Sequence, residues 1–123
     1  MGRKDRTTQD HYILDENDAP RLEPNLGRWM NWMAANDNVR RLEETKITDE
    51  ITVITEFIGV KSCPNPDGGP PKVFQSMVVG GKPNGMMQAY GNVAAAREGH
   101  PLLVRMVRKY FTEEKDENSS SGK

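Results

Sequence analysis

Few side chains in this 123-residue sequence could perform acid–base or nucleophilic chemistry. His11 and His100 are its only histidines, and Cys63 is its only cysteine. His100 could act as a general base, but we interpret it as a local hydrogen-bonding residue because no partner is evident beside it. Cys63 has no neighbouring histidine and is interpreted as an ordinary thiol. We therefore expect no enzyme, and a phosphodiesterase-like activity that uses His100 or an acidic metal site stays open as a third alternative.

Two acidic pairs, Glu43-Glu44 and Asp49-Glu50, could in principle bind a divalent cation. Adjacent residues of a strand point to opposite faces, so we interpret these pairs as turn or solvated surface. The sequence contains no P-loop, paired-histidine metal motif or nucleophile elbow. We therefore expect neither a metal nor a cofactor.

Glycine pairs are the most suggestive signal for ligand binding. A pair of glycines lets the backbone approach a ligand closely and can offer amide hydrogens to phosphate oxygens. Lysines at the predicted strand ends could neutralise a phosphate, and an indole on a helix could stack on a base. The candidate ligand-binding residues are Trp32, Lys61, Gly68, Gly69, Lys72, Gly80, Gly81 and Lys82. The alternative, which we favour for the glycines themselves, is that they only form tight turns between strands.

Composition indicates one small domain. The 17 basic and 18 acidic residues nearly balance, which argues against a duplex DNA-binding protein. No apolar run approaches the roughly 20 residues that span a membrane, and a single cysteine fits a reducing cytosol. We expect residues 1–10 to be disordered, residues 11–111 to form a single α+β domain, and residues 112–123 to form a disordered acidic and serine-rich tail.

Apolar spacing predicts an antiparallel sheet of about five strands with two main helices packed on it. The strands are expected at residues 11–15, 39–47, 51–60, 72–80 and 85–90, with a hairpin turn at 48–50. Strand 51–60 is apolar on both faces, so a second subunit is expected to cover one of them. The sequence therefore predicts a homo-oligomer, a dimer or larger.

The first helix is expected after Pro24-Asn25, and the second after Asn92 as N-cap. Pro101 is expected to kink the second helix or to start a new one. The expected buried stripes are Leu26, Trp29, Met30 and Met33 in the first helix, and Leu103, Met106, Val107 and Tyr110 in the second. We expect one core formed by Leu26, Trp29, Met30, Phe57, Phe74, Leu103 and Val107.

Several motifs occur in a recognisable order over about residues 12–107. They are Tyr12-Ile13-Leu14-Asp15, Trp29-Met30-Asn31-Trp32, Gly68-Gly69-Pro70-Pro71 and Phe74-Gln75-Ser76-Met77-Val78-Val79-Gly80-Gly81. This pattern resembles a widespread family of small phage and prophage accessory proteins. The sequence departs from that pattern in a proline-rich insert at 63–67 and in Pro101.

The resemblance implies a phage protein that acts in the cytoplasm of an infected bacterium and counters host defence. We therefore expect a non-enzymatic anti-defence protein that sequesters a small nucleotide-like immune signal as a homo-oligomer. The alternative is a protein–protein inhibitor that masks a host defence or regulatory protein. Neither a membrane nor duplex DNA is expected as a partner.

Overall fold

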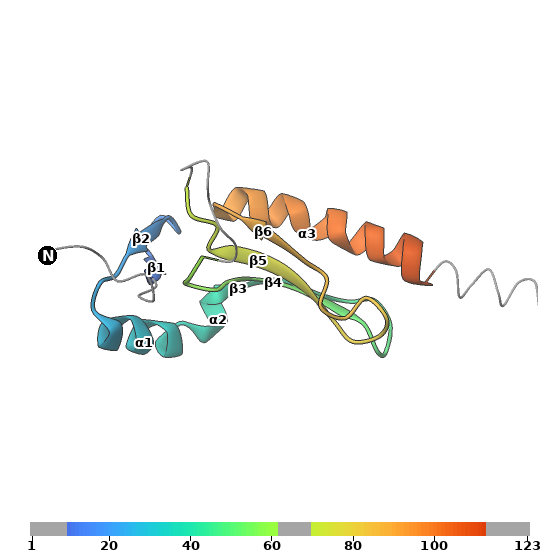
Figure 1. Cartoon of the computed structure of the whole chain (residues 1–123), viewed down its shortest axis with the longest axis horizontal. Coiled ribbons are helices and arrows are strands. Elements are labelled where there is room, and N and C mark those ends of the chain that lie inside the picture. The colour runs from blue at the N-terminus through green and yellow to red at the C-terminus, as the bar shows by residue number, and fades with distance from the viewer. Residues whose placement is uncertain (1–9, 62–69, 113–123) are drawn as a thin grey trace, which may run out of the picture.

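A four-stranded antiparallel sheet forms the centre of the computed structural model, which describes residues 10–61 and 70–112. Its strands follow one another in space as in sequence: β3 (Arg41–Lys46), β4 (Thr52–Phe57), β5 (Phe74–Val79) and β6 (Met87–Tyr90). Helix α3 (Val93–Val107) lies along one face of this sheet and continues into a π-helical turn, η1 (Arg108–Thr112) (Figure 1). Within the described ranges, no helix combines the length and apolar character that crossing a bilayer requires.

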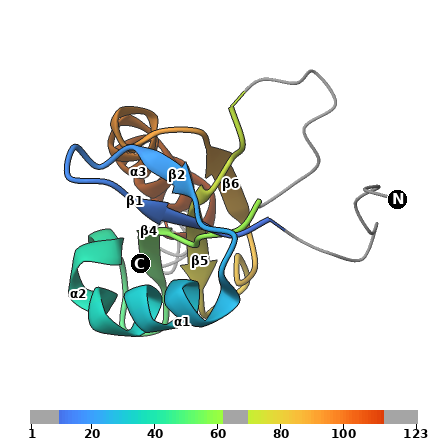
Figure 2. The same cartoon turned by 90° about the vertical axis from the view of Figure 1, so that its left-hand side faces the viewer.

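The N-terminal part closes one end of the sheet. Strands β1 (Tyr12–Leu14) and β2 (Pro20–Leu22) form a separate antiparallel hairpin beside α1 (Leu26–Ala35), as Figure 2 shows. The Tyr12 amide donates a hydrogen bond to the Gly59 carbonyl at 2.8 Å, and the Trp29 indole nitrogen donates to the Tyr12 carbonyl at 3.0 Å. The hairpin and α1 are thereby held to each other and to the segment that follows β4.

Short-range side-chain hydrogen bonds begin the helices where the sequence predicts. Asn25 Oδ1 accepts from the Arg28 amide at 2.9 Å, and Asn92 Oδ1 accepts from the Ala95 amide at 2.8 Å. Each bond satisfies an amide that has no partner inside the first turn of its helix. The hairpin turn at 48–50 is also confirmed, because Thr48 Oγ1 accepts from the Ile51 amide at 3.0 Å.

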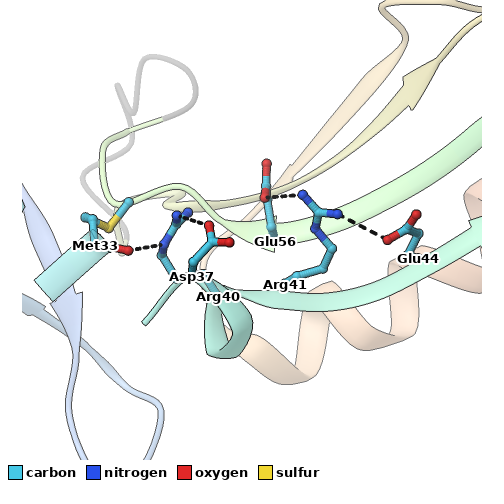
Figure 3. A network of polar contacts seen from close by, with 6 residues as sticks. All are labelled: Met33, Asp37, Arg40, Arg41, Glu44 and Glu56. Carbon is cyan, nitrogen blue, oxygen red and sulfur yellow. Dashed lines mark hydrogen bonds and ion pairs between the residues drawn. The ribbon is translucent and has the colours of Figure 1, made fainter. Parts of the chain in front are cut away.

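A short helix, α2 (Asp37–Arg40), leads from α1 into β3. The Arg40 side chain fixes this connection, donating to the Met33 carbonyl at 3.1 Å and to Asp37 Oδ1 at 2.7 Å (Figure 3). The β3–β4 pairing then shifts between Arg41 and Glu43, which is a β-bulge. The bulge explains why apolar alternation in this segment is imperfect.

The core consists of two apolar clusters. The first apolar cluster contains Leu14, Phe57, Val73, Phe74, Tyr90 and Ala96. The second apolar cluster contains Ile51, Val53, Val78, Leu103, Val104 and Val107. The prediction of one core is therefore wrong: Phe57 and Phe74 lie in the first cluster, while Leu103 and Val107 lie in the second.

The α+β class and the antiparallel pairing are confirmed, but the predicted sheet is wrong in detail. The first strand belongs to a separate two-stranded sheet with β2, which the sequence did not predict because it has only three residues. Of the two main helices, only α3 packs along the four-stranded sheet; no residue of α1 is fully buried. In α1, Leu26 and Met30 are 53% and 56% exposed, so the predicted stripe is displaced toward Trp32.

Helix α3 runs through Pro101 as one helix, so the predicted start of a new helix at that residue is wrong. Proline has no amide hydrogen, so the helical bond to the Arg97 carbonyl is lost. Buried residues on both sides of Pro101, among them Ala96 and Leu103, nevertheless hold the helix on the sheet. Met106 and Tyr110 are 40% and 58% exposed, so the predicted stripe of this helix is wrong at those positions.

Candidate functional site: an arginine groove above a buried polar row

A row of polar side chains crosses the whole sheet beneath α3. It is formed by one residue from each strand and one from the helix: Thr45, Thr55, Ser76, Tyr90 and His100. Thr55 and Ser76 are fully buried, and His100 is 4% exposed. We call these five residues the polar row. Tyr90 also belongs to the first apolar cluster, and Thr55 and Ser76 lie between the two clusters along β4 and β5.

Every member of the polar row is joined to the next by a hydrogen bond. The imidazole of His100 lies between two threonines, with Nε2 2.8 Å from Thr45 Oγ1 and Nδ1 2.6 Å from Thr55 Oγ1. The Thr55 hydroxyl bonds the Ser76 hydroxyl, which accepts from the Tyr90 hydroxyl at 3.0 Å. Burial of a polar group costs free energy unless it is hydrogen-bonded, and this chain of bonds offsets that cost.

Strand register and helical spacing bring these residues together. Thr55 and Ser76 are direct partners in the β4–β5 ladder. Both point toward α3, because they share the buried face of the sheet with the apolar residues two positions before and after them. The bulge in β3 brings Glu43 opposite Thr55, so Glu43 and Thr45 also lie on the α3 side. His100 lies one turn after Ala96 on the buried stripe of α3.

Gly99 lets the ring of Tyr90 reach the polar row. A Cβ atom at position 99 would lie 2.3 Å from Tyr90 Cε1 and 2.4 Å from its hydroxyl oxygen. Such distances are far below van der Waals contact, so only glycine fits while the ring keeps this position. In the Gly99-His100 pair, the glycine therefore leaves room for the Tyr90 ring, and the histidine belongs to the polar row.

A groove of about 550 Å³ runs between α3 and the edge strand β3, above one end of the polar row. Thr45 and His100 belong to its lining together with Glu43, and three arginines line it from the helical side: Arg97, Arg105 and Arg108. Positions 97, 105 and 108 recur on one side of a helix with 3.6 residues per turn. We call this the arginine groove.

An ion pair crosses the arginine groove from α3 to β3. Arg97 Nη1 lies 3.3 Å from Glu43 Oε2, in an ion pair whose side chains are 52% and 40% exposed. Exposed ion pairs contribute little free energy, so an incoming anion can compete with Glu43 for Arg97. Burial lowers the pKa of His100 below its usual 6.5, and the nearby Glu43 carboxylate opposes that shift only in part. The imidazole is therefore neutral at pH 7.

The predicted ligand-binding residues that the structure describes lie in separate places. Lys61 and Lys72 lie where β4 ends and β5 begins, whereas Gly80, Gly81 and Lys82 follow the other end of β5. The six residues of β5 separate these groups by about 20 Å at the usual rise of a strand. The predicted pair at positions 68 and 69 lies outside the described residues.

The second glycine pair serves a turn. Gly80 and Gly81 have φ values of 94° and 66°, and a Cβ at Gly80 would lie 1.6 Å from the Glu50 carbonyl oxygen. The Gly80 amide already donates to Asn84 Oδ1 at 2.7 Å. This corrects the predicted role of that amide as a phosphate donor and supports the tight-turn alternative.

Trp32 is a packing residue in this structure. Its ring meets Phe57 edge-on, with 5.7 Å between centroids, and it is half-buried against the first apolar cluster. The arginine groove was not predicted, although its arginines recur at helical spacing. The signal for the polar row was a threonine and a serine, each in the middle of an otherwise apolar strand face.

The face of the sheet opposite α3 is a second candidate surface. Its centre is apolar, with Val79 and Met87 44% and 48% exposed and with Ile54 and Met77 half-buried. Charged side chains flank this centre along β3. Arg41 lies 3.1 Å from Glu44 and 3.9 Å from Glu56 (Figure 3). We call this the open sheet face, because no described helix lies along it in Figure 1.

No family model, curated protein or solved structure matches this chain. The function must therefore be argued from the arginine groove, the polar row and the open sheet face. Within the part of the chain that the structure describes, no three histidine, cysteine or acidic side chains are grouped as metal ligands.

Proposed function

We propose that the protein is a non-enzymatic binding protein that sequesters a small, phosphate-bearing, nucleotide-like molecule in the arginine groove. The observation that carries this proposal is the stripe of three arginines above a neutral polar floor. Guanidinium groups bind phosphate through paired hydrogen bonds, which makes them suited to nucleotides. The groove volume of about 550 Å³ falls within the range of small-molecule sites.

The hydrogen bonding of His100 supports binding over catalysis. Both of its ring nitrogens face threonine hydroxyls at 2.6–2.8 Å, so neither is directed at a ligand in the groove. A general base must come within hydrogen-bonding reach of the proton that it removes. His100 therefore serves to hold the floor of the groove, and the arginines supply the affinity.

The biological setting of this proposal comes from the sequence resemblance. A phage accessory protein in the cytoplasm of an infected bacterium would gain from removing a nucleotide immune signal. A sequestering protein needs affinity and abundance, and it needs no turnover. The arginine groove supplies the first of these requirements.

The open sheet face supports a further element of the proposal, that the chain acts as a homodimer. Its charged rim carries both signs, Arg41 and Lys46 against Glu44 and Glu56, so a second copy meets no net repulsion. Its apolar centre would be covered by the same centre of the partner. The same apolar centre also favours the alternative function, inhibition of a host defence or regulatory protein by masking it.

Native mass spectrometry of protein purified from infected bacteria tests the proposed function. The proposal predicts a retained small molecule whose mass and fragments identify phosphate groups. A host polypeptide bound in place of a small molecule would contradict sequestration and support the inhibitor. Release of a processed nucleotide after addition of substrate would contradict the non-enzymatic assignment.

A further inference from the structure

The polar row has a direction, and that direction bears on the arginine groove. Each hydroxyl has one hydrogen to donate, and a neutral imidazole donates from one nitrogen and accepts at the other. Tyr90 donates to Ser76 at one end of the row, while Thr45 lines the arginine groove at the other. The arrangement of donors between these two ends can therefore be worked out residue by residue.

Ser76 accepts from Tyr90, and Thr55 is the hydroxyl next to it. If Ser76 donates to Thr55, then the Thr55 hydroxyl donates its own hydrogen bond to Nδ1 of His100, 2.6 Å away. The neutral ring then carries its hydrogen on Nε2 and donates to Thr45 at 2.8 Å. In this order each hydroxyl inside the row donates once and accepts once. In the reverse order Thr55 donates to Ser76. Ser76 then accepts hydrogen bonds from both Tyr90 and Thr55, and its own hydrogen has no partner in the row.

We propose that Thr45 is a ligand-binding residue whose hydroxyl, oriented by the polar row, donates a hydrogen bond to a phosphate oxygen in the arginine groove. Among the described residues, the only side-chain hydrogen bond of Thr45 is the one to His100. Its hydrogen is therefore directed to the groove, where Arg97 and Arg105 provide positive charge. This inference rests on the proposed function and adds a neutral donor on the floor of the site.

The donor gives the site a selectivity that arginines alone lack. Guanidinium groups attract any anion, but a fixed hydroxyl at the floor favours one whose oxygen reaches between β3 and α3. Buried, oriented donors contribute to specificity because a ligand that leaves them unpaired loses affinity.

Two measurements test the inference. Long-range ¹H–¹⁵N NMR of the ligand-free protein reports which imidazole nitrogen of His100 carries the hydrogen, and the Nε2–H form is expected. Calorimetry with ATP and cyclic AMP then compares Thr45→Val with Thr45→Ser. The valine should weaken binding about ten- to hundred-fold, and the serine should bind within about three-fold of the wild type. Thr52→Val, on the opposite face of the sheet, is the matched control and should bind as the wild type does.

The outcomes separate this inference from the proposed function. An Nδ1–H ring overturns the direction of the row. Wild-type affinity in a folded Thr45→Val protein, with weakened binding in Arg105→Gln, overturns the role of Thr45 and leaves the arginine groove intact. Failure of the wild type to bind either nucleotide, or inorganic pyrophosphate, overturns the proposed function and the ligand contact together. If Thr45→Val does not fold, the inference is judged by which ring nitrogen of His100 carries the hydrogen and by whether Thr45→Ser keeps full affinity.

Discussion

Gly99 of α3 and Tyr90 of β6 are so close that a single added methyl group at position 99 would lie 2.3 Å from the tyrosine ring. The buried ring is fixed at its far end by the hydrogen bond from its hydroxyl to Ser76. It therefore has little freedom to move aside. The close approach of these two residues sets the distance between α3 and the sheet, and with it the geometry of the polar row.

Gly99→Ala should consequently destabilise the fold by about 1–3 kcal/mol, because overpacking forces the ring or the helix to shift. This loss should outweigh the higher helix propensity of alanine, which is worth about 1 kcal/mol. Urea unfolding measures the change. Glu98→Ala, at the exposed neighbouring position, is the control and should change stability by less than about 0.5 kcal/mol. Equal stability of Gly99→Ala and wild type would show that α3 does not pack as described.

The buried imidazole predicts a pH dependence of stability. Burial lowers the pKa of His100 in the native state, whereas the unfolded chain keeps a pKa near 6.5. Above pH 6.5 the ring is neutral in both states. As the pH falls below 6.5, the unfolded state binds the proton first, so the free energy of unfolding decreases, by at most about 1.4 kcal/mol per pH unit.

Denaturant unfolding at pH 7.5, 6.5 and 5.5 checks this effect. His100→Gln should show a smaller loss of stability over the same range, although it starts from a lower value. The quantity to compare is the change in the free energy of unfolding with pH, and not the absolute stability of the variant. A slope identical to that of the wild type would mean that another group is responsible.

Two neighbouring residues of α1 test which side of that helix faces the core. Trp32→Ala should cost about 2–4 kcal/mol, because the half-buried indole packs edge-on against the fully buried Phe57. Met30→Ala should cost less than about 0.5 kcal/mol, since that side chain is 56% exposed. Thermal unfolding of the two variants gives the ranking. The reverse ranking would restore the helix register predicted from apolar spacing alone.

Features that depend on a few neighbouring residues were predictable from the sequence. The Asn25 and Asn92 caps and the turn at Thr48 involve hydrogen bonds over two or three residues, so residue type and position were enough. The buried stripe of α1 was not predictable in this way, because the helix lies at the end of the sheet and buries only part of one side. The exposed Leu26 and Met30 satisfy helical spacing equally well.

The candidate site required information that spacing does not contain. The polar row depends on the exact pairing of Thr55 with Ser76 and on a bulge before Glu43, neither of which can be located from apolar spacing alone. The glycine–lysine hypothesis, in contrast, conflicts with the predicted strand order itself. Successive connections of an antiparallel meander lie at opposite ends of the sheet, so Lys61 and Lys72 lie at the end of β5 opposite Lys82.

The open sheet face predicts a dimer that a single charge disrupts. Light scattering at micromolar concentration should give twice the mass of the chain for the wild type. Met77→Glu, at the half-buried centre of the face, should give a monomer because a carboxylate buried between two apolar surfaces is costly. Leu102→Glu, at a residue of α3 that is 58% exposed, should remain a dimer. A monomeric wild type would show that the open sheet face does not form a dimer.

We propose that the arginine groove, and not the glycine–lysine loops, binds a phosphate-bearing ligand. Isothermal titration calorimetry of the wild type, Arg105→Gln and Lys82→Gln against linear and cyclic nucleotides tests it most directly. Arg105→Gln should weaken binding by about 1–3 kcal/mol through a lost charge-assisted hydrogen bond, whereas Lys82→Gln should bind like the wild type. Binding that depends on Lys82 and is indifferent to Arg105, or no nucleotide binding by the folded protein, would contradict it.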